Sequence, residues 1–188
     1  MRRDLPSYEE LLKIFSAEKL KPLRIITIAL CLGIVFFFIV VMVLYSIKNE
    51  NRSPELEPEM LNILLIILFI TSFTVYSIVF LLGDKILSGI IKNAKISFAE
   101  IVKPDSRSLL GIITSFTIVR LAMFEGSALF GLVILLLSVI NNHLDSNPVY
   151  WLGSIPGLLM LFYAAIIFPT GERVAQLVQD KIYPLIEE

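Results

Sequence analysis

Two ionisable side chains lie inside an apolar stretch of the chain, RLAMFEGSALFGLV at residues 120–133. They are Arg120 and Glu125, and ionisable residues within such segments are functional candidates by default. On a helix with 3.6 residues per turn, two side chains that are five residues apart point in directions that differ by about 140°. We therefore do not expect the salt bridge that a spacing of four would allow.

Glu125 is the main candidate for chemistry. It shares a helix face with Ala122, Ala128 and Leu132, and the alanines would let a second helix pack closely. We expect its carboxyl group to be protonated or hydrogen-bonded, and either to bind an ion or to join two helices. Arg120 is expected nearer the membrane interface, where its long side chain can reach lipid phosphates or another helix.

Three hydroxyl side chains form a second candidate group. Thr71, Thr74 and Ser77 share one face of a predicted helix at a spacing of three. Such a face can pack against another helix or line a polar path, and its hydroxyls can also bond to their own backbone.

No pattern in the sequence predicts catalysis, a cofactor or a metal site. The single histidine, His143, and nearby Asp145 fall in a short polar stretch expected to be an exposed loop, and the single cysteine, Cys31, falls in an apolar run. The net charge of −1, without a basic and aromatic stripe, argues against nucleic-acid binding. We therefore predict a protein that is not an enzyme and binds no cofactor.

Four long apolar segments must position these residues. The chain is 56% hydrophobic, against about 45–50% in ordinary soluble domains. A helix crosses a membrane with about 20 apolar residues and satisfies its own backbone hydrogen bonds. The sequence thus predicts an all-α, polytopic membrane protein with four transmembrane helices, at about residues 25–47, 60–82, 112–140 and 149–168.

Basic residues predict the orientation of these helices. Thirteen Lys and Arg residues fall in the N-terminal arm, the second loop and the C-terminal tail, and only two fall in the other loops. The excess marks the cytoplasmic side. We expect both termini in the cytoplasm and the chain in a bacterial inner membrane.

Amphipathic cytoplasmic helices are predicted at both ends, in residues 1–24 and 169–188. In the first, Ser7 and Glu10 have the spacing of a capping box. Its apolar residues are candidates for docking on the membrane surface or on a partner subunit: Leu11, Leu12 and Phe15.

Further helical features are expected beside the second and fourth spans. The second helix is expected to continue past Asp84 until Pro104. Pro169 should end the last span, and Thr170 should cap the helix that follows.

Residues 122–133 resemble the carboxylate-bearing helix of the rotary ATPase proteolipid. The positions that match in type and spacing are Ala122, Glu125, Ala128, Phe130, Gly131, Leu132 and Val133. This resemblance implies that Glu125 binds a proton or a sodium ion.

Over its whole length, the chain resembles uncharacterised small bacterial membrane proteins that pair an R-x-A-x-x-E-G span with a P-T step and a basic helix. The matching positions are Arg120, Ala122, Glu125, Gly126, Pro169, Thr170 and Arg173. This second resemblance implies a four-helix membrane protein and supplies no activity.

Two functions remain open at this point. The first is a non-enzymatic integral membrane subunit, or an accessory or assembly protein, of a larger membrane complex. The alternative is an oligomeric proton or ion conductor in which Glu125 titrates. The expected partners are the lipid bilayer and other membrane subunits or further copies of this chain.

Overall fold

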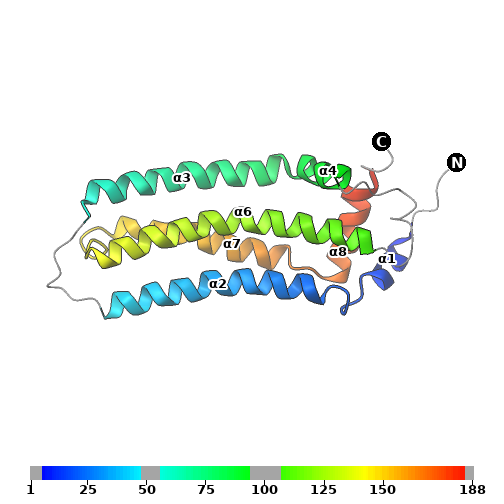
Figure 1. Cartoon of the computed structure of the whole chain (residues 1–188), viewed down its shortest axis with the longest axis horizontal. Coiled ribbons are helices and arrows are strands. Elements are labelled where there is room, and N and C mark those ends of the chain that lie inside the picture. The colour runs from blue at the N-terminus through cyan, green and yellow to red at the C-terminus, as the bar shows by residue number, and fades with distance from the viewer. Residues whose placement is uncertain (1–5, 48–55, 94–106, 185–188) are drawn as a thin grey trace. The chain divides into compact units, whose positions relative to one another are not determined.

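The computed structural model describes residues 6–47, 56–93 and 107–184, and the regular structure within them is helical (Figure 1). Four helical segments are long and apolar enough to cross a membrane, which confirms the predicted all-α class. They are α2 (Lys21–Ser46), α3 (Pro58–Leu81), α6 (Arg107–Ile140), and η1 with α7 (Pro148–Ser154 and Ile155–Ile166).

The helix ends differ from prediction in three places. Helix α6 begins at Arg107, and its 34 residues measure about 51 Å at 1.5 Å per residue, more than a bilayer core of about 30 Å requires. The second helix does not continue past Asp84. It ends at Leu81, and a separate helix, α4 (Gly83–Asn93), follows, because a glycine weakens a helix at that position. The fourth segment begins as a 3₁₀-helix, with Asn147 as its N-cap. Pro104 lies outside the described residues.

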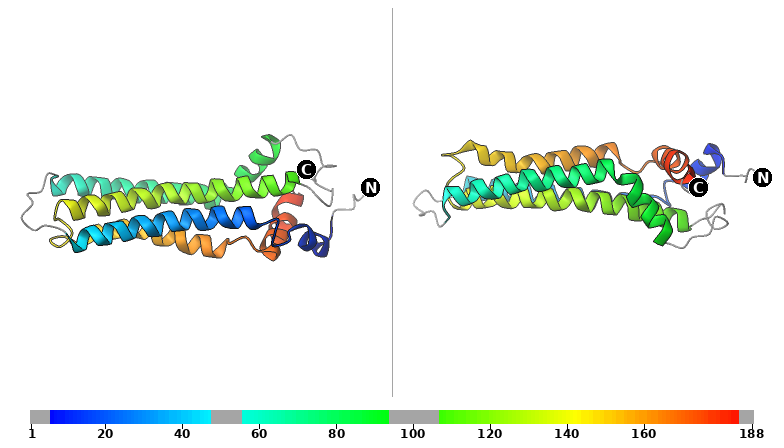
Figure 2. Two further views of the ribbon diagram at one scale, coloured as in Figure 1. Left: turned by 60° about the horizontal axis from the view of Figure 1, so that its bottom comes forward. Right: turned by 90° about the horizontal axis from the view of Figure 1, so that it is seen from above.

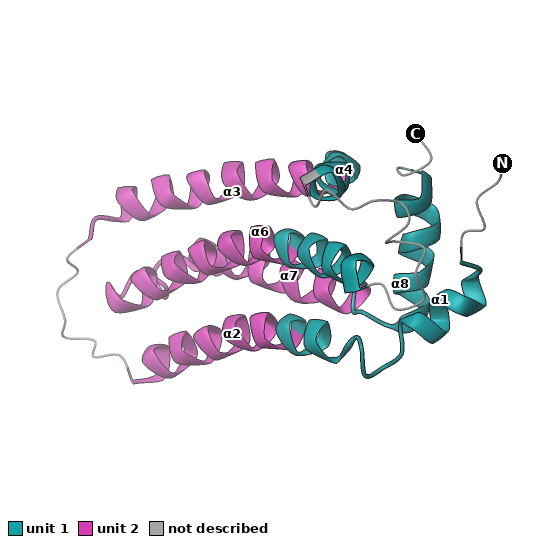
Figure 3. Ribbon diagram, turned by 45° about the vertical axis from the view of Figure 1, so that its right-hand side comes forward, with its two compact units in different colours: residues 1–27, 81–120, 167–188 teal, residues 28–80, 121–166 magenta. Residues whose placement is uncertain are grey.

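The chain forms two compact units, which are coloured separately in Figure 3. Unit 1 comprises residues 1–27, 81–120 and 167–188, and unit 2 comprises residues 28–80 and 121–166. The two terminal segments belong to one unit together with α4 and the beginning of α6.

Unit 1 has a hydrophobic core of its own. Its helices include α1 (Tyr8–Ile14) and α8 (Gly171–Leu177), which continues as a π-helical turn, Val178–Ile182. The buried core residues come from all parts of the unit: Leu11, Phe15, Leu20, Leu23, Leu87, Leu109, Ile112, Ile113, Phe116, Val174, Ala175, Val178, Ile182 and Tyr183. The apolar faces of the terminal helices are therefore covered by the chain itself.

The predicted helix caps and the predicted docking residues all lie in unit 1. Ser7 and Glu10 form the predicted capping box, and Thr170 caps α8 by accepting a hydrogen bond from the Arg173 amide. Leu11 is 0% exposed and Phe15 2% exposed, and the partly buried Leu12 packs against the same core. These three residues therefore do not form a free docking surface in this structure.

Polar contacts join the N- and C-terminal segments within unit 1. Arg24 donates from Nε to the carbonyl oxygen of Pro169 at 2.9 Å, where α7 gives way to α8. The Tyr183 hydroxyl donates to the carbonyl oxygen of Pro6 at 3.3 Å. A hydrogen bond to a charged group contributes about 1.5–3 kcal/mol to stability, which is more than a bond between neutral groups contributes. The contact made by the charged Arg24 side chain is therefore the stronger of the two.

Unit 2 is a set of helices packed side by side, from α2, α3, α6 and η1–α7 (Figures 1 and 2). Two glycines meet where α6 packs against η1: a Cβ placed on Gly131 would lie 2.1 Å from the carbonyl oxygen of Gly153, and one placed on Gly153 would lie 2.6 Å from that of Gly131. The backbones of α6 and η1 therefore touch directly. Only glycine fits on either side of this contact.

The end of unit 2 that follows α6 is held by polar side chains. Asn141 accepts a hydrogen bond from the amide of Leu56 at 2.9 Å, and His143 donates from Nε2 to the carbonyl oxygen of Leu56 at 2.8 Å. The Tyr45 hydroxyl donates to Asp145 at 2.7 Å. His143 is thus half-buried and hydrogen-bonded, whereas the sequence predicted an exposed loop residue.

The glycine contact predicts a large effect of one methyl group. Gly131→Ala should lower the free energy of unfolding by about 1–3 kcal/mol, because the added Cβ would overlap a carbonyl oxygen that belongs to a helix backbone. Gly126→Ala on the same helix is the matched control, since nothing lies within 4 Å of its Cβ position. Thermal unfolding of the purified protein in detergent measures both, and equal midpoints would contradict the contact.

Tyr183 predicts an alkaline transition in unit 1. Burial of its ring, and secondly the Glu10 carboxylate, raise the pKa of Tyr183 from 10 to about 12. Because the folded pKa is the higher one, the stability from neutral Tyr183 is complete below pH 10 and is lost as pH rises toward 12. Denaturation series from pH 9 to 12 should therefore show a steeper loss for the wild type than for Tyr183→Phe. Parallel curves would contradict the burial of this hydroxyl.

Candidate functional site

Glu125 stands apart in the charge distribution of the chain. Every Lys and Arg in the described residues belongs to unit 1. The described acidic residues of unit 2 are Glu57, Glu59, Asp145 and Glu125, and the first three lie at the end of α3 or in a loop. Glu125 is therefore the one acidic or basic residue described within the helices of unit 2 away from their ends.

Two residues of α2, Gly33 and Cys31, lie beside this carboxyl group. Its Oε1 atom is 4.0 Å from the point where a Cβ of Gly33 would sit, so the missing side chain of Gly33 leaves space between the carboxyl group and the backbone of α2. Cys31 is close enough to interact electrostatically with it. Glu125 is half-buried, and the described residues give it no hydrogen bond and no ion pair. The described residues also contain no group of three His, Cys, Asp or Glu side chains that could hold a metal ion.

Small residues occupy exposed positions on α6, which carries Glu125, and on α2, which carries Gly33. Ala29 and Gly33 of α2, and Ala122 and Gly126 of α6, are each spaced by four and are all exposed. Nothing lies within 4 Å of a Cβ placed on Gly126. We call these four residues with Glu125 the Glu125 surface. Two residues expected on the same face, Ala128 and Leu132, are buried instead.

Arg120 belongs to unit 1 and contacts an aromatic ring. Its Cζ atom lies 5.0 Å from the centre of the Phe116 ring, within the range of a cation–π interaction. Phe116 is a member of the unit 1 core, so the half-buried Arg120 side chain covers the edge of that core.

Two of the three predicted hydroxyls bond to the backbone of their own helix. Thr71 donates to the carbonyl oxygens of Ile67 and Leu68, and Thr74 donates to that of Ile70, so both bond to their own helix. Both threonines are exposed, and Ser77 is half-buried.

A different pair of hydroxyls joins two helices. Ser72 of α3, 5% exposed, forms a hydrogen bond with Ser127 of α6, 7% exposed. No sequence motif marks this pair, although the spacing of Ser72 from the apolar Leu65 and Leu68 places it on the buried face of α3.

Phe124, the residue that precedes Glu125 in the sequence, is part of a stack of aromatic rings. The ring of Phe124 lies between those of Tyr76 and Tyr163, with centres 4.7 and 4.3 Å apart and nearly parallel planes. Such stacked pairs contribute about 0.5–1.5 kcal/mol beyond their buried area. Because the three rings come from α3, α6 and α7, they fix the position of the α6 segment that carries Glu125.

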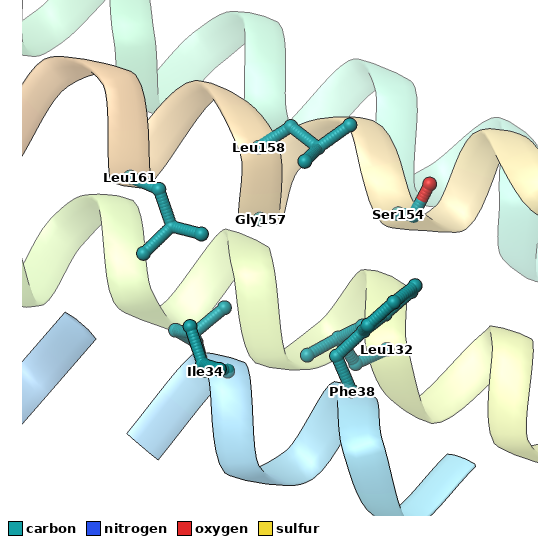
Figure 4. Close-up of a pocket in the computed structure, with 8 residues that line it drawn as sticks. Ile34, Phe38, Leu132, Ser154, Gly157, Leu158 and Leu161 are labelled. Carbon is teal, nitrogen blue, oxygen red and sulfur yellow. The ribbon is translucent and has the colours of Figure 1, made fainter. Parts of the chain in front are cut away.

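Unit 2 also contains an apolar cavity of about 110 Å³, shown in Figure 4. Its lining comes from α2, α6 and η1–α7 and includes Ile34, Phe38, Leu132 and Gly157. Ser154 also lines this cavity, and its hydroxyl donates to the carbonyl oxygen of Trp151 at 2.7 Å. Glu125 does not line the cavity, so the two features are separate.

Stability measurements can distinguish the polar residues that join two helices of unit 2 from those that do not. Ser72→Ala should cost about 0.6–1.7 kcal/mol of stability, the range for hydrogen bonds between membrane helices, because it removes the Ser72–Ser127 hydrogen bond between α3 and α6. Thr71→Val and Glu125→Gln should each change stability by less than about 0.5 kcal/mol, since no contact between helices is lost. Thermal unfolding in detergent measures the loss of stability in each variant. A loss in Glu125→Gln as large as that in Ser72→Ala would contradict this prediction.

Comparison of the chain with protein-family models, curated proteins and solved structures found no match. No residue role is therefore transferred to Glu125 from a relative. Its chemistry follows from three features: a half-buried carboxyl group, the bare backbone of Gly33 beside it, and the small exposed residues around both.

Proposed function

We propose that this chain is an integral membrane protein of a bacterial inner membrane, with unit 2 in the bilayer and unit 1 in the cytoplasm. One observation carries the proposal: the described Lys and Arg residues all belong to unit 1. Placing one such residue at the centre of a transmembrane helix costs about 2.5–3.5 kcal/mol by insertion measurements. The excess of basic residues also marks the cytoplasmic side, so both termini would lie there.

The dimensions of unit 2 support this placement. Its helical segments have lengths of about 30 Å, which match the hydrocarbon core of a bilayer. At the end that carries Asp145, the Tyr45 and Trp151 rings pack edge to face with centres 6.0 Å apart. Tyr and Trp are enriched at membrane–water interfaces, so this end would lie at the outer face. Lys48 and Arg52, the two basic residues expected there, lie outside the described residues.

Within the membrane, we propose a non-enzymatic role as a subunit or accessory protein of a larger complex. The support comes from the exposed surface around Glu125, where a carboxyl group and four small residues are left uncovered by the described chain. An intramembrane carboxyl group is costly in lipid and is usually paired with another polar group.

The ion-conducting alternative receives less support. A conducting path needs polar groups that continue from Glu125 along the helices, and the hydroxyls expected to supply them, Thr71 and Thr74, bond to their own backbone. The hydroxyls of Ser72 and Ser127 are buried and form a hydrogen bond with each other. We therefore propose the subunit role as the primary function.

Purification from native membranes tests the subunit role. A full-length chain with a C-terminal tag, extracted in mild detergent, should migrate on native gels with other membrane proteins, in a particle far larger than the 21.2 kDa chain. Quantitative mass spectrometry of that particle should give the same partners in a fixed ratio to the chain. Recovery of the chain alone, or with further copies of itself only, would contradict the proposal.

A further inference from the structure

We propose that the Glu125 surface binds a transmembrane helix of a different protein, and that this helix presents a Lys, Arg or His side chain to Glu125. This inference rests on the proposed function and adds the chemistry of the partner. The occupant is defined by charge complementarity, by the space above the small residues and by the depth of the carboxyl group.

The charge argument begins with the half-buried carboxyl group. Glu125 has no hydrogen bond or ion pair within the described residues, and its Oε1 atom faces the bare backbone of Gly33. Lipid tails offer no hydrogen-bond donor, so lipid contact leaves the polar group unsatisfied. A basic side chain from another helix would donate to the carboxylate and cancel its charge.

The surface is shaped for a close approach. The four exposed residues of the Glu125 surface are small, Ala29 and Gly33 on α2 and Ala122 and Gly126 on α6, and the exposed side chains about one turn further along are larger, at Phe36 and Leu129. A Cβ placed on Gly126 would have no atom within 4 Å. One placed on Gly33 would have only the Glu125 Oε1 atom, at 4.0 Å. Small residues at a spacing of four let helix backbones approach closely in membranes, where packing rather than the hydrophobic effect drives association.

A second copy of the chain is a poorer occupant of this surface. Copies inserted in the same orientation carry Glu125 at the same depth, so a symmetric contact would place carboxylate against carboxylate. The described part of unit 2 contains no Lys or Arg, and Arg120, the basic residue of α6 nearest to Glu125 in the sequence, packs on the Phe116 ring of the unit 1 core. Like charges in contact are unfavourable, which points to a partner of different sequence.

Photo-crosslinking in the native host tests the inference with the full-length chain. A benzophenone amino acid at Ala122 should capture one protein, and the same probe at Phe73, which is 74% exposed on α3, is the positional control. Peptide mapping should place the Ala122 adduct in an apolar segment of the partner that contains Lys, Arg or His. Glu125→Gln should lower the adduct yield about three- to tenfold.

Two further variants separate charge from shape. Gly126→Leu should block capture by filling the surface, whereas Gly111→Leu, at an equally open glycine of α6 in unit 1, should not. Glu125→Lys should abolish capture, and changing the partner's basic residue to Glu should restore it. An adduct formed with a second copy, with lipid alone or with a segment lacking a basic residue would overturn the inference.

The outcomes distinguish this inference from the subunit role. If the native complex and the adduct both persist in Glu125→Gln and Gly126→Leu, the Glu125 surface is not the binding site, while the subunit role stands. If the wild-type chain migrates alone on native gels and the Ala122 probe captures no protein, both are wrong.

Discussion

The cost of a charged side chain in apolar surroundings is the constraint that organises this chain. The described Lys and Arg residues all belong to unit 1, and the polar groups in the helices of unit 2 are largely hydroxyls that already have partners. Glu125 is the exception, because its carboxyl group lies among these helices without a described hydrogen bond. The proposed membrane placement and the proposed partner helix both follow from this distribution of charge.

Packing within unit 2 depends on contacts at short range. Apolar helices gain little from the hydrophobic effect once lipid surrounds them, so close approach and a few hydrogen bonds must hold them together. The Gly131–Gly153 contact brings α6 and η1 to backbone distance, and the Ser72–Ser127 pair joins α3 to α6. On the α2 side, by contrast, Gly33 remains exposed beside Glu125, which leaves a surface where a further helix can pack.

Local sequence features predicted the parts of this fold that depend on local physics. The four apolar segments, the Ser7–Glu10 capping box and the Thr170 cap were all evident, because each involves neighbouring residues. The pairing of distant segments was not evident. The amphipathic pattern of Leu11 and Phe15 showed that one face is covered, but not that the chain's own core covers it. For the same reason the sequence singled out Glu125 but not Gly33, which lies on another helix.

Chemical labelling from the two sides of the membrane tests the placement of the two units most directly. Single cysteines would replace Ser146, exposed in unit 2, and Ser16, exposed in unit 1, in a Cys31→Ala background. With spheroplasts and a membrane-impermeant maleimide, the cysteine at position 146 should react at once, and the one at position 16 only after permeabilisation. Reaction at position 16 in intact spheroplasts, or protection at position 146, would contradict a cytoplasmic unit 1 and a membrane-embedded unit 2.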